Sequence, residues 1–297
     1  MIPSSLRGSL FVLAGALCFS STGFTQALIA PYDASPFLVG GTRMLVACAA
    51  LFLLCAWRGR LPSRTGWPIK NVLLCTLGIL GNQVFFFTGV LHTGVALGTV
   101  VSLGFVPVSA ALLAWLVLKE KPQRAWYPAT ALAILGLILL NGGGTGGVPM
   151  QALLAPLAAG ACYALYLVYS KPLTRTHTEE SIMLVLFFLC GLCLLPFFFI
   201  YPTAWLGTPT GLTAALHLGV ITAAAAYCLT LTGLKLTPAA TASTLGLAEP
   251  FGAALLGICC LGEQISYQGL AGMACILGSA VFIIVIPHMA FLHSKKF

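Results

Sequence analysis

The 297 residues are 59% hydrophobic and only 7% charged, whereas a soluble domain carries about 25% charged residues. So few charges cannot cover a water-soluble surface, and the alternation of polar and apolar residues that is typical of an outer-membrane barrel is absent. The formal charge of +8 does not indicate a nucleic-acid partner, because the basic residues fall singly or in short groups between apolar segments.

Apolar stretches of about 20 residues, the length that a helix needs to cross a bilayer, recur along the whole chain. In the first half we predict membrane-spanning helices at 8–29, 36–56, 69–91, 94–118 and 126–141. In the second half we predict them at 151–170, 181–201, 211–233, 239–261 and 267–288. The first segment exceeds the apolar run of a signal peptide and another span follows it at once, so we expect it to be retained. The sequence therefore predicts an all-α integral membrane protein with ten transmembrane helices in a lipid bilayer.

The positions of Lys and Arg indicate the orientation, because cytoplasmic loops hold an excess of basic residues. Thirteen of the fourteen basic residues lie on one side of the predicted helices. They are Arg7, Arg58, Arg60, Arg64, Lys70, Lys119, Lys121, Arg124, Lys171, Arg175, Lys235, Lys295 and Lys296. The loops on the other side hold none, so we expect both termini to be cytoplasmic.

Two halves of the chain resemble each other when residues about 144 positions apart are compared. Thr88-Gly89 matches Thr232-Gly233, and Pro107 falls on Pro250 with a one-residue gap. Because each half holds five spans, the second half must enter the membrane from the opposite side. We therefore predict two inverted repeats, 1–141 and 151–297, joined by a Gly-rich outer linker at 142–150, with a substrate site near the midplane where they meet.

A charged residue inside the membrane is costly and needs a partner or a function. Glu249 lies midway along its predicted helix and precedes Pro250, which lacks an N–H and usually kinks a helix. This carboxylate is a candidate for coupling or gating, through proton binding or substrate contact, and the alternative is a structural Glu tied to the backbone or to Arg43. Arg43 lies about 10 Å away in depth, estimated from the helical rise. It could hold a substrate carboxylate, gate the pathway, pair with Glu249 or anchor the outer interface.

Polar positions that coincide between the halves are the best candidates for lining a central cavity, because a pseudo-two-fold axis would gather them around one centre. Thr22 corresponds to Tyr166, Gln83 to Tyr227, Thr99 to Ser243, and Phe19 to Tyr163. We predict substrate contacts for Thr22, Gln83, Thr99, Tyr163, Tyr166, Tyr227 and Ser243. Hydroxyl and amide groups also hold membrane helices together, which is the alternative for each residue alone.

No constellation for catalysis or metal binding is visible in the sequence, and no cofactor is expected. His217 and His92 stand alone near the ends of their predicted helices, and no paired catalytic carboxylates are recognised. Gly94 and Gly98 have the four-residue spacing that lets helices approach closely. The sequence therefore predicts that the protein is not an enzyme.

Glu249-Pro250, followed by Leu261-Gly262-Glu263, resembles the EamA domain of the drug/metabolite transporter superfamily. The resemblance spans nearly the whole chain and implies ten helices in two such domains, in a bacterial inner membrane. It also implies that the first four helices of each half surround the cavity. The chain departs from the family pattern at 18–21, where Cys-Phe-Ser-Ser replaces the usual tryptophan-glycine, and at Val106, the position equivalent to Glu249.

We therefore expect a secondary transporter that moves amino acids or related small metabolites by alternating access, as an exporter. The alternative is a proton-coupled carrier of organic cations such as quaternary amines or drugs, in which aromatic residues cage the cation. Substrate, direction, coupling ion and oligomeric state are not set by these residues, so proton coupling and a homodimer stay open.

Overall fold

The computed structural model describes residues 4–32, 34–63, 66–140, 149–262 and 264–294, and within these ranges all regular structure is helical. Asp33, Arg64, Glu263, residues 141–148 and the lysines at 295–296 lie outside the described residues. The predictions that concern the outer linker and the Glu263 end of the family motif therefore have no structural counterpart here.

The helices follow the chain in the order of the predicted spans. The first half contains α1 (Ser4–Ile29), η1 (Ala30–Tyr32), α2 (Pro36–Trp57), α3 (Ile69–Thr93), α4 (Val95–Leu113), η2 (Ala114–Leu118) and α5 (Trp126–Leu140). The second half contains η3 (Met150–Leu153), α6 (Leu154–Leu173), α7 (Glu179–Leu194), α8 (Phe197–Ile200), η4 (Ala204–Gly207), α9 (Pro209–Gly219), η5 (Val220–Ala225), α10 (Ala226–Leu236), α11 (Ala239–Gly246), α12 (Ala248–Leu261) and α13 (Tyr267–Ser294).

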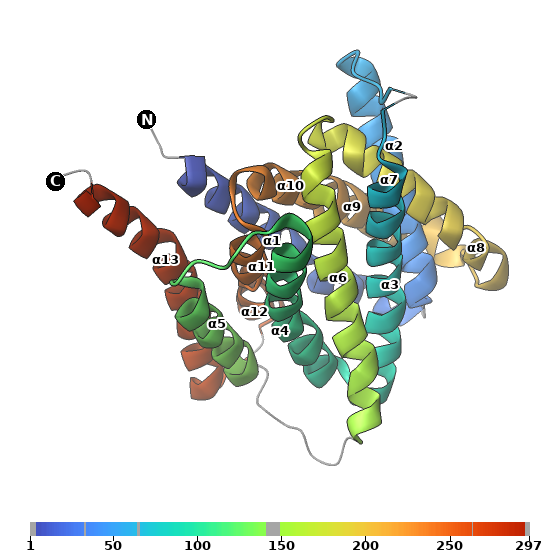
Figure 1. Cartoon of the computed structure of the whole chain (residues 1–297). Helices are drawn as coiled ribbons and strands as arrows, with labels where there is room; N and C mark the ends of the chain where they lie inside the picture. The colour runs from blue at the N-terminus through green and yellow to red at the C-terminus, as the bar shows by residue number, and fades with distance from the viewer. Residues whose placement is uncertain (1–3, 33, 64–65, 141–148, 263, 295–297) are drawn as a thin grey trace.

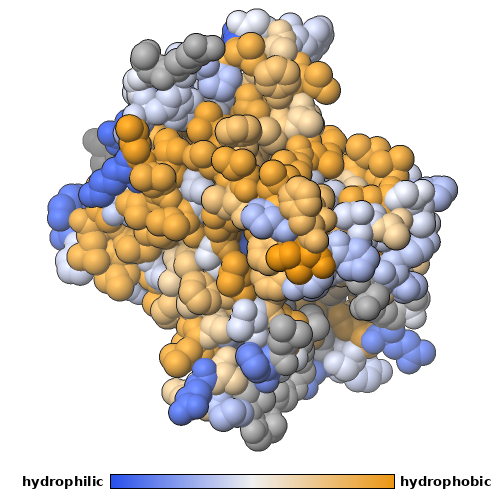
Figure 2. Space-filling view, turned by 90° about the vertical axis from the view of Figure 1, so that its right-hand side faces the viewer, coloured by the Kyte–Doolittle hydropathy of each residue, from blue (hydrophilic) through white to orange (hydrophobic). Residues whose placement is uncertain are grey.

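Nine of the described helical segments are long and apolar enough to cross a membrane, and α5 is a further apolar helix of 15 residues. Most predicted boundaries agree within three residues, but α1 begins at Ser4 and α13 extends to Ser294. Large apolar side chains such as Leu53, Phe188 and Leu192 are exposed, and such side chains cover the middle of the face in Figure 2. A surface of this kind is suited to lipid, so the chain is a multi-pass membrane protein.

The two halves interlock instead of forming separate bundles. Helix α1 packs on α10 and α12 of the second half, while α6 packs on α3 and α4 of the first half. The helices α2 and α7 pack on each other, and α5 lies beside α13 (Figure 1). This set of contacts is largely unchanged when each helix is exchanged for its counterpart in the other half. The tertiary packing thus has the two-fold pattern that the sequence similarity predicts.

Matched glycines make this packing close. A Cβ on Gly89 would lie 2.7 Å from Cδ of Pro156, and a Cβ on Gly233 would lie 2.5 Å from Cγ2 of Val12. Pro156 is 144 residues after Val12, as Gly233 is after Gly89, so equivalent residues make equivalent contacts. Gly94 has a different role, because it ends α3 with φ +79° and a Cβ there would meet nothing within 4 Å. The prediction that Gly94 lets two helices approach closely is wrong, because the chain turns at this residue.

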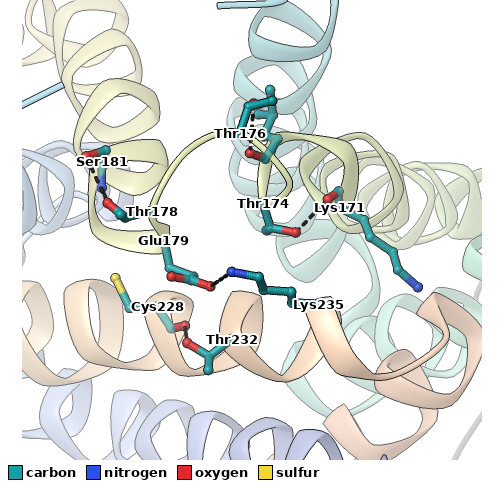
Figure 3. A network of polar contacts seen from close by, with 10 residues as sticks. Lys171, Thr174, Thr176, Thr178, Glu179, Ser181, Cys228, Thr232 and Lys235 are labelled. Atoms are coloured by element: carbon teal, nitrogen blue, oxygen red, sulfur yellow. Dashed lines mark hydrogen bonds and ion pairs between the residues drawn. The ribbon is translucent and has the colours of Figure 1, made fainter. Parts of the chain in front are cut away.

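Three ion pairs of the described residues join helix ends on the side of the bundle where the basic residues lie. Lys171 Nζ lies 2.7 Å from Glu120 Oε1 and also donates to the carbonyl of Thr237 at 3.0 Å. The ion pair between Lys235 and Glu179 joins the end of α10 to the start of α7 (Figure 3). In the third ion pair, Nη1 of Arg58 at the end of α2 lies 2.7 Å from Oε1 of Glu180 in the first turn of α7. These contacts hold five helices together at one end of the bundle.

Candidate functional site

The candidate site is built around four consecutive residues of α1, Phe19 to Thr22. Phe19 is 8% exposed and Ser20 2% exposed. The Ser20 hydroxyl lies 2.8 Å from the backbone carbonyl oxygen of Glu249 and 3.0 Å from that of Ala16, so that its contact with Glu249 joins α1 to α12. The hydroxyl of Thr22 is buried and has no hydrogen-bond partner among the described residues. Because successive helical residues point about 100° apart, this short segment reaches several neighbouring helices at once.

Arg43 of α2 is held in the membrane interior by the backbone of a distorted helix. Its Nη2 donates to the carbonyl of Thr222, in the π-helical turn η5 between α9 and α10. A π-turn widens a helix and shifts its hydrogen-bond register, so that a carbonyl can accept a donor from outside the helix. The guanidinium also lies 5.8 Å from the centre of the Phe19 ring, within the range of a cation–π contact. Its Nε is buried without a partner in the described part of the chain.

Glu249 lies directly after a break in its transmembrane helix. The α-helix α11 ends at Gly246 and α12 begins at Ala248, with Leu247 in a turn between them. Pro250 explains this break, because its missing N–H leaves a carbonyl one turn earlier without its usual donor. Glu249 therefore falls in the first turn of α12, where the helix dipole favours a negative charge. The predicted helix break is confirmed, and Pro107 in contrast lies inside the continuous helix α4.

Arg43 and Glu249 are side chains of opposite charge type that share Phe19 as a neighbour. The guanidinium lies 5.8 Å from the centre of the Phe19 ring, and Glu249 lines the same cavity as Phe19. No N–O distance of 4.0 Å or less joins the two side chains within the described residues.

Aromatic rings cluster around Phe19, which neighbours Arg43 and lines the cavity with Glu249. Tyr227 makes edge-to-face contacts with Phe19, Tyr166 and Phe187, at centroid distances of 5.0, 5.3 and 5.3 Å. Tyr163 contacts Tyr166 at 5.7 Å. Such contacts fix the orientation of each ring, because edge-to-face pairs are favoured over parallel stacking. These rings form an aromatic wall, in which Phe19 is the residue that contacts Arg43.

A small cavity adjoins this wall and has a volume of about 30 Å³. Its lining includes Phe19, Val106, Tyr163, Ser243 and Glu249. Phe19 and Tyr163 are equivalent positions of the two halves, and so are Val106 and Glu249. Both members of each pair therefore face one space, as expected for a cavity on a pseudo-two-fold axis.

The structure brings together some of the predicted site residues and leaves others apart. Tyr163, Ser243 and Glu249 line the cavity, and Tyr227 is adjacent through its contact with Phe19. Tyr166 is fully buried, with its hydroxyl 3.8 Å from the sulfur of Met183. Gln83 lies against Gly40 of α2, while Thr22 and Thr99 are not among the lining residues. Substrate contact by these residues stays a prediction.

Ser20, His217 and Thr222 contact residues of the candidate site, and the sequence did not single them out for such a role. His217 does not stand alone, since its Nε2 lies 2.9 Å from the hydroxyl of Ser21; the prediction that it does was wrong. Neither Ser20 nor Ser21 has a polar counterpart in the other half, so comparison of the repeats could not select them. A π-turn leaves no pattern in a sequence of Val, Ile, Thr and Ala, which is why the Thr222 carbonyl was missed. Within the described ranges, no group of three His, Cys, Asp or Glu side chains is placed to hold a metal ion.

Comparison with known proteins gives the family. The sequence pattern of the EamA-like transporter family matches this chain twice, over residues 6–142 and 150–285. "Uncharacterized transporter YwfM" of Bacillus subtilis (strain 168) is 36% identical over 280 residues, covering 94% of this chain and 94% of that protein. A protein of known crystal structure superposes with a TM-score of 0.82 at 19% identity, covering 95% of this chain and 98% of the other, and this likeness shows the fold alone. Two consecutive matches over nearly the whole chain show that the protein belongs to the EamA-like transporter family.

Proposed function

We propose that the protein is a secondary transporter that exports amino acids or related small metabolites across the bacterial plasma membrane. The observation that carries this proposal is the placement of Arg43 and Glu249, two opposite charges in the bilayer interior without a direct ion pair. An amino acid carries a carboxylate and an ammonium group, which require one partner of each sign. The neighbouring rings of Phe19 and Tyr163 provide apolar contact for a side chain.

The volume of the cavity supports a mechanism by alternating access. A space of about 30 Å³ holds little more than one water molecule, whereas pockets for small molecules are usually about 300 Å³ or larger. Substrate can therefore enter only after the helices around Phe19 and Glu249 separate. The helix break at Leu247 and the π-turn η5 are the natural places for such movement, because regular hydrogen bonding is interrupted there.

The interlocked packing suggests which parts would move. Because α1 packs on helices of the second half and α6 on helices of the first, rocking of 1–141 against 151–297 would break most of the bundle. We propose that the moving units instead combine helices of both halves, such as α1 with α10 and α12. Ten spans that include α5, inverted repeats and cytoplasmic termini belong to this proposal, and the basic loops support that orientation.

The alternative function is proton-coupled transport of organic cations. In that case Phe19, Tyr163, Tyr166 and Tyr227 would surround the cation and Glu249 would supply the opposite charge. The guanidinium of Arg43 already lies 5.8 Å from the Phe19 ring centre, and Tyr166 is fully buried. Because a cationic ligand would be repelled by Arg43 at this position, we favour the zwitterionic substrate.

Flux measurements in proteoliposomes test the proposal. Purified protein would be reconstituted and tested with a panel of radiolabelled amino acids, and with choline and lipophilic cations as the competing class. We expect saturable flux of one or more amino acids that Arg43→Met reduces at least tenfold. Flux of cations alone, unaffected by Arg43→Met, would establish the alternative. Absence of flux for every compound from a correctly folded protein would refute the substrate class.

A further inference from the structure

His217 is a titratable side chain in the interior of a membrane helix. It lies eight residues after Pro209, the first residue of α9, which corresponds to about 12 Å along the helix axis. Its Nε2 is 2.9 Å from Oγ of Ser21 on α1. Ionisable residues at such positions are rare and usually have a function, because burial of a charge in the bilayer is costly.

The neighbours of Ser21 favour one protonation of the imidazole. Oγ of Ser21 also lies 2.9 Å from the carbonyl oxygen of Cys18, which can only accept a hydrogen bond. A hydroxyl has one proton to donate, and when the Ser21 proton goes to Cys18, Nε2 of His217 donates to Ser21 Oγ. In that arrangement the neutral imidazole is the Nε2–H tautomer, and its Nδ1 is the atom to which a further proton can bind.

His217 is connected to the Arg43 centre through one continuous helix. Five residues later comes Thr222, whose carbonyl accepts the hydrogen bond from Arg43. The elements that pack most closely on α9 are α1, α2, η4 and η5. The titratable side chains that α1 and α2 carry at this level are Cys18, Arg43 and Cys48, while η4 and η5 carry none. Arg43 is the one permanent charge in this set of described residues.

We propose that His217 is a second proton-binding site of the transporter, separate from Glu249, which binds a proton on Nδ1 while Nε2–H remains donated to Ser21. The imidazolium and the Arg43 guanidinium repel each other across the π-turn. Proton binding therefore weakens the hydrogen bond from Arg43 to the Thr222 carbonyl. The coupling step rests on the proposed transport function, but proton binding by His217 does not.

Nitrogen NMR of the histidine side chains tests proton binding directly. The full-length protein, labelled with ¹⁵N-histidine and placed in lipid nanodiscs, would be titrated between about pH 5 and pH 8, where imidazole changes charge. The His217 signal is identified by its loss in His217→Gln and, independently, in His217→Asn. We expect the Nε2–H tautomer at the alkaline end and protonation of Nδ1 at the acidic end. Ser21→Ala should turn the alkaline form into a mixture of tautomers.

The control is His177→Gln, which removes a histidine stacked on Trp67 outside the transmembrane helices and should leave the His217 signal unchanged. An Nδ1–H tautomer at the alkaline end, or a His217 signal that stays constant over the whole range, would overturn the proposal. Flux is measured separately, and His217→Gln should flatten its pH dependence between pH 5 and 8. If NMR shows protonation while no substrate is transported, the proton site stands and the transport function fails.

Discussion

Glu249→Gln is the substitution that most directly tests the proposed site. Glutamine keeps the size of the side chain and one carbonyl oxygen, and it removes the charge. Glu249 has no ion pair of 4.0 Å or less among the described residues. The backbone carbonyl of residue 249, which accepts the hydrogen bond from Ser20, is unchanged by the substitution. The variant should therefore fold and keep the contact between α1 and α12, while the electrostatic field of the cavity changes.

The expected change in stability is small because two effects oppose each other. Loss of the carboxylate removes an interaction with the dipole of α12 that contributes about 0.3–1 kcal/mol. It also removes the cost of holding a charge in the bilayer interior. That cost is about 2.5–3.5 kcal/mol on insertion scales for an unpaired charge, and less beside Arg43. We expect the free energy of unfolding to change by no more than about 2 kcal/mol, and in the stabilising direction. Transport should fall at least tenfold if the charge takes part in the cycle.

The measurement combines flux in proteoliposomes at several pH values with thermal unfolding of the same preparation. The matched control is Glu180→Gln, which removes a carboxylate that lies outside the cavity and belongs to the more exposed ion pair with Arg58. A Glu249→Gln protein that is folded and inactive supports an ionic role, whereas flux at the rate of the unmodified protein refutes coupling through Glu249. If the variant instead unfolds more easily, and Arg43→Met adds no further cost, the two residues form a structural pair.

Further substitutions test the packing and the ion pairs. Gly233→Ala should lower the unfolding temperature, at a cost of about 1–3 kcal/mol, because its Cβ would lie 2.6 Å from the carbonyl oxygen of Gly8. Gly23→Ala, whose Cβ would meet nothing within 4 Å, should be neutral or stabilising. Equal effects of the two substitutions would contradict the packing. Glu120→Gln and Lys171→Met should each destabilise by about 1.5–3 kcal/mol, and the double variant by less than their sum, because the ion pair is only 28% and 15% exposed at its two side chains. The ion pair between Arg58 of the α2 end and Glu180 of α7 is more exposed, with 46% of the arginine side chain accessible, and its coupling energy should stay below about 1 kcal/mol. Additive effects at both pairs would show that neither ion pair has a measurable coupling energy.

The sequence determined the membrane architecture and the two-repeat pattern of this protein, because both rest on features that local chemistry imposes. About 20 apolar residues span a bilayer only as a helix, since every backbone group must be satisfied within the segment. Pro250 marks the break in its helix because it lacks an N–H, although its counterpart Pro107 lies inside the continuous helix α4. The match of Phe19 with Tyr163 and of Val106 with Glu249 was also visible, and all four residues line one cavity.

Only the tertiary structure decided which face of each helix points inward. In a soluble protein a polar stripe marks the outer face of a helix, but a membrane helix is apolar toward lipid and toward its neighbours alike. For this reason, the sequence could not separate Tyr163, which lines the cavity, from Tyr166, which is buried against Met183. The π-turn that offers its carbonyl to Arg43 and the contact of Ser21 with His217 arise between helices far apart in the chain. Their geometry depends on how those helices pack, and no local pattern encodes it.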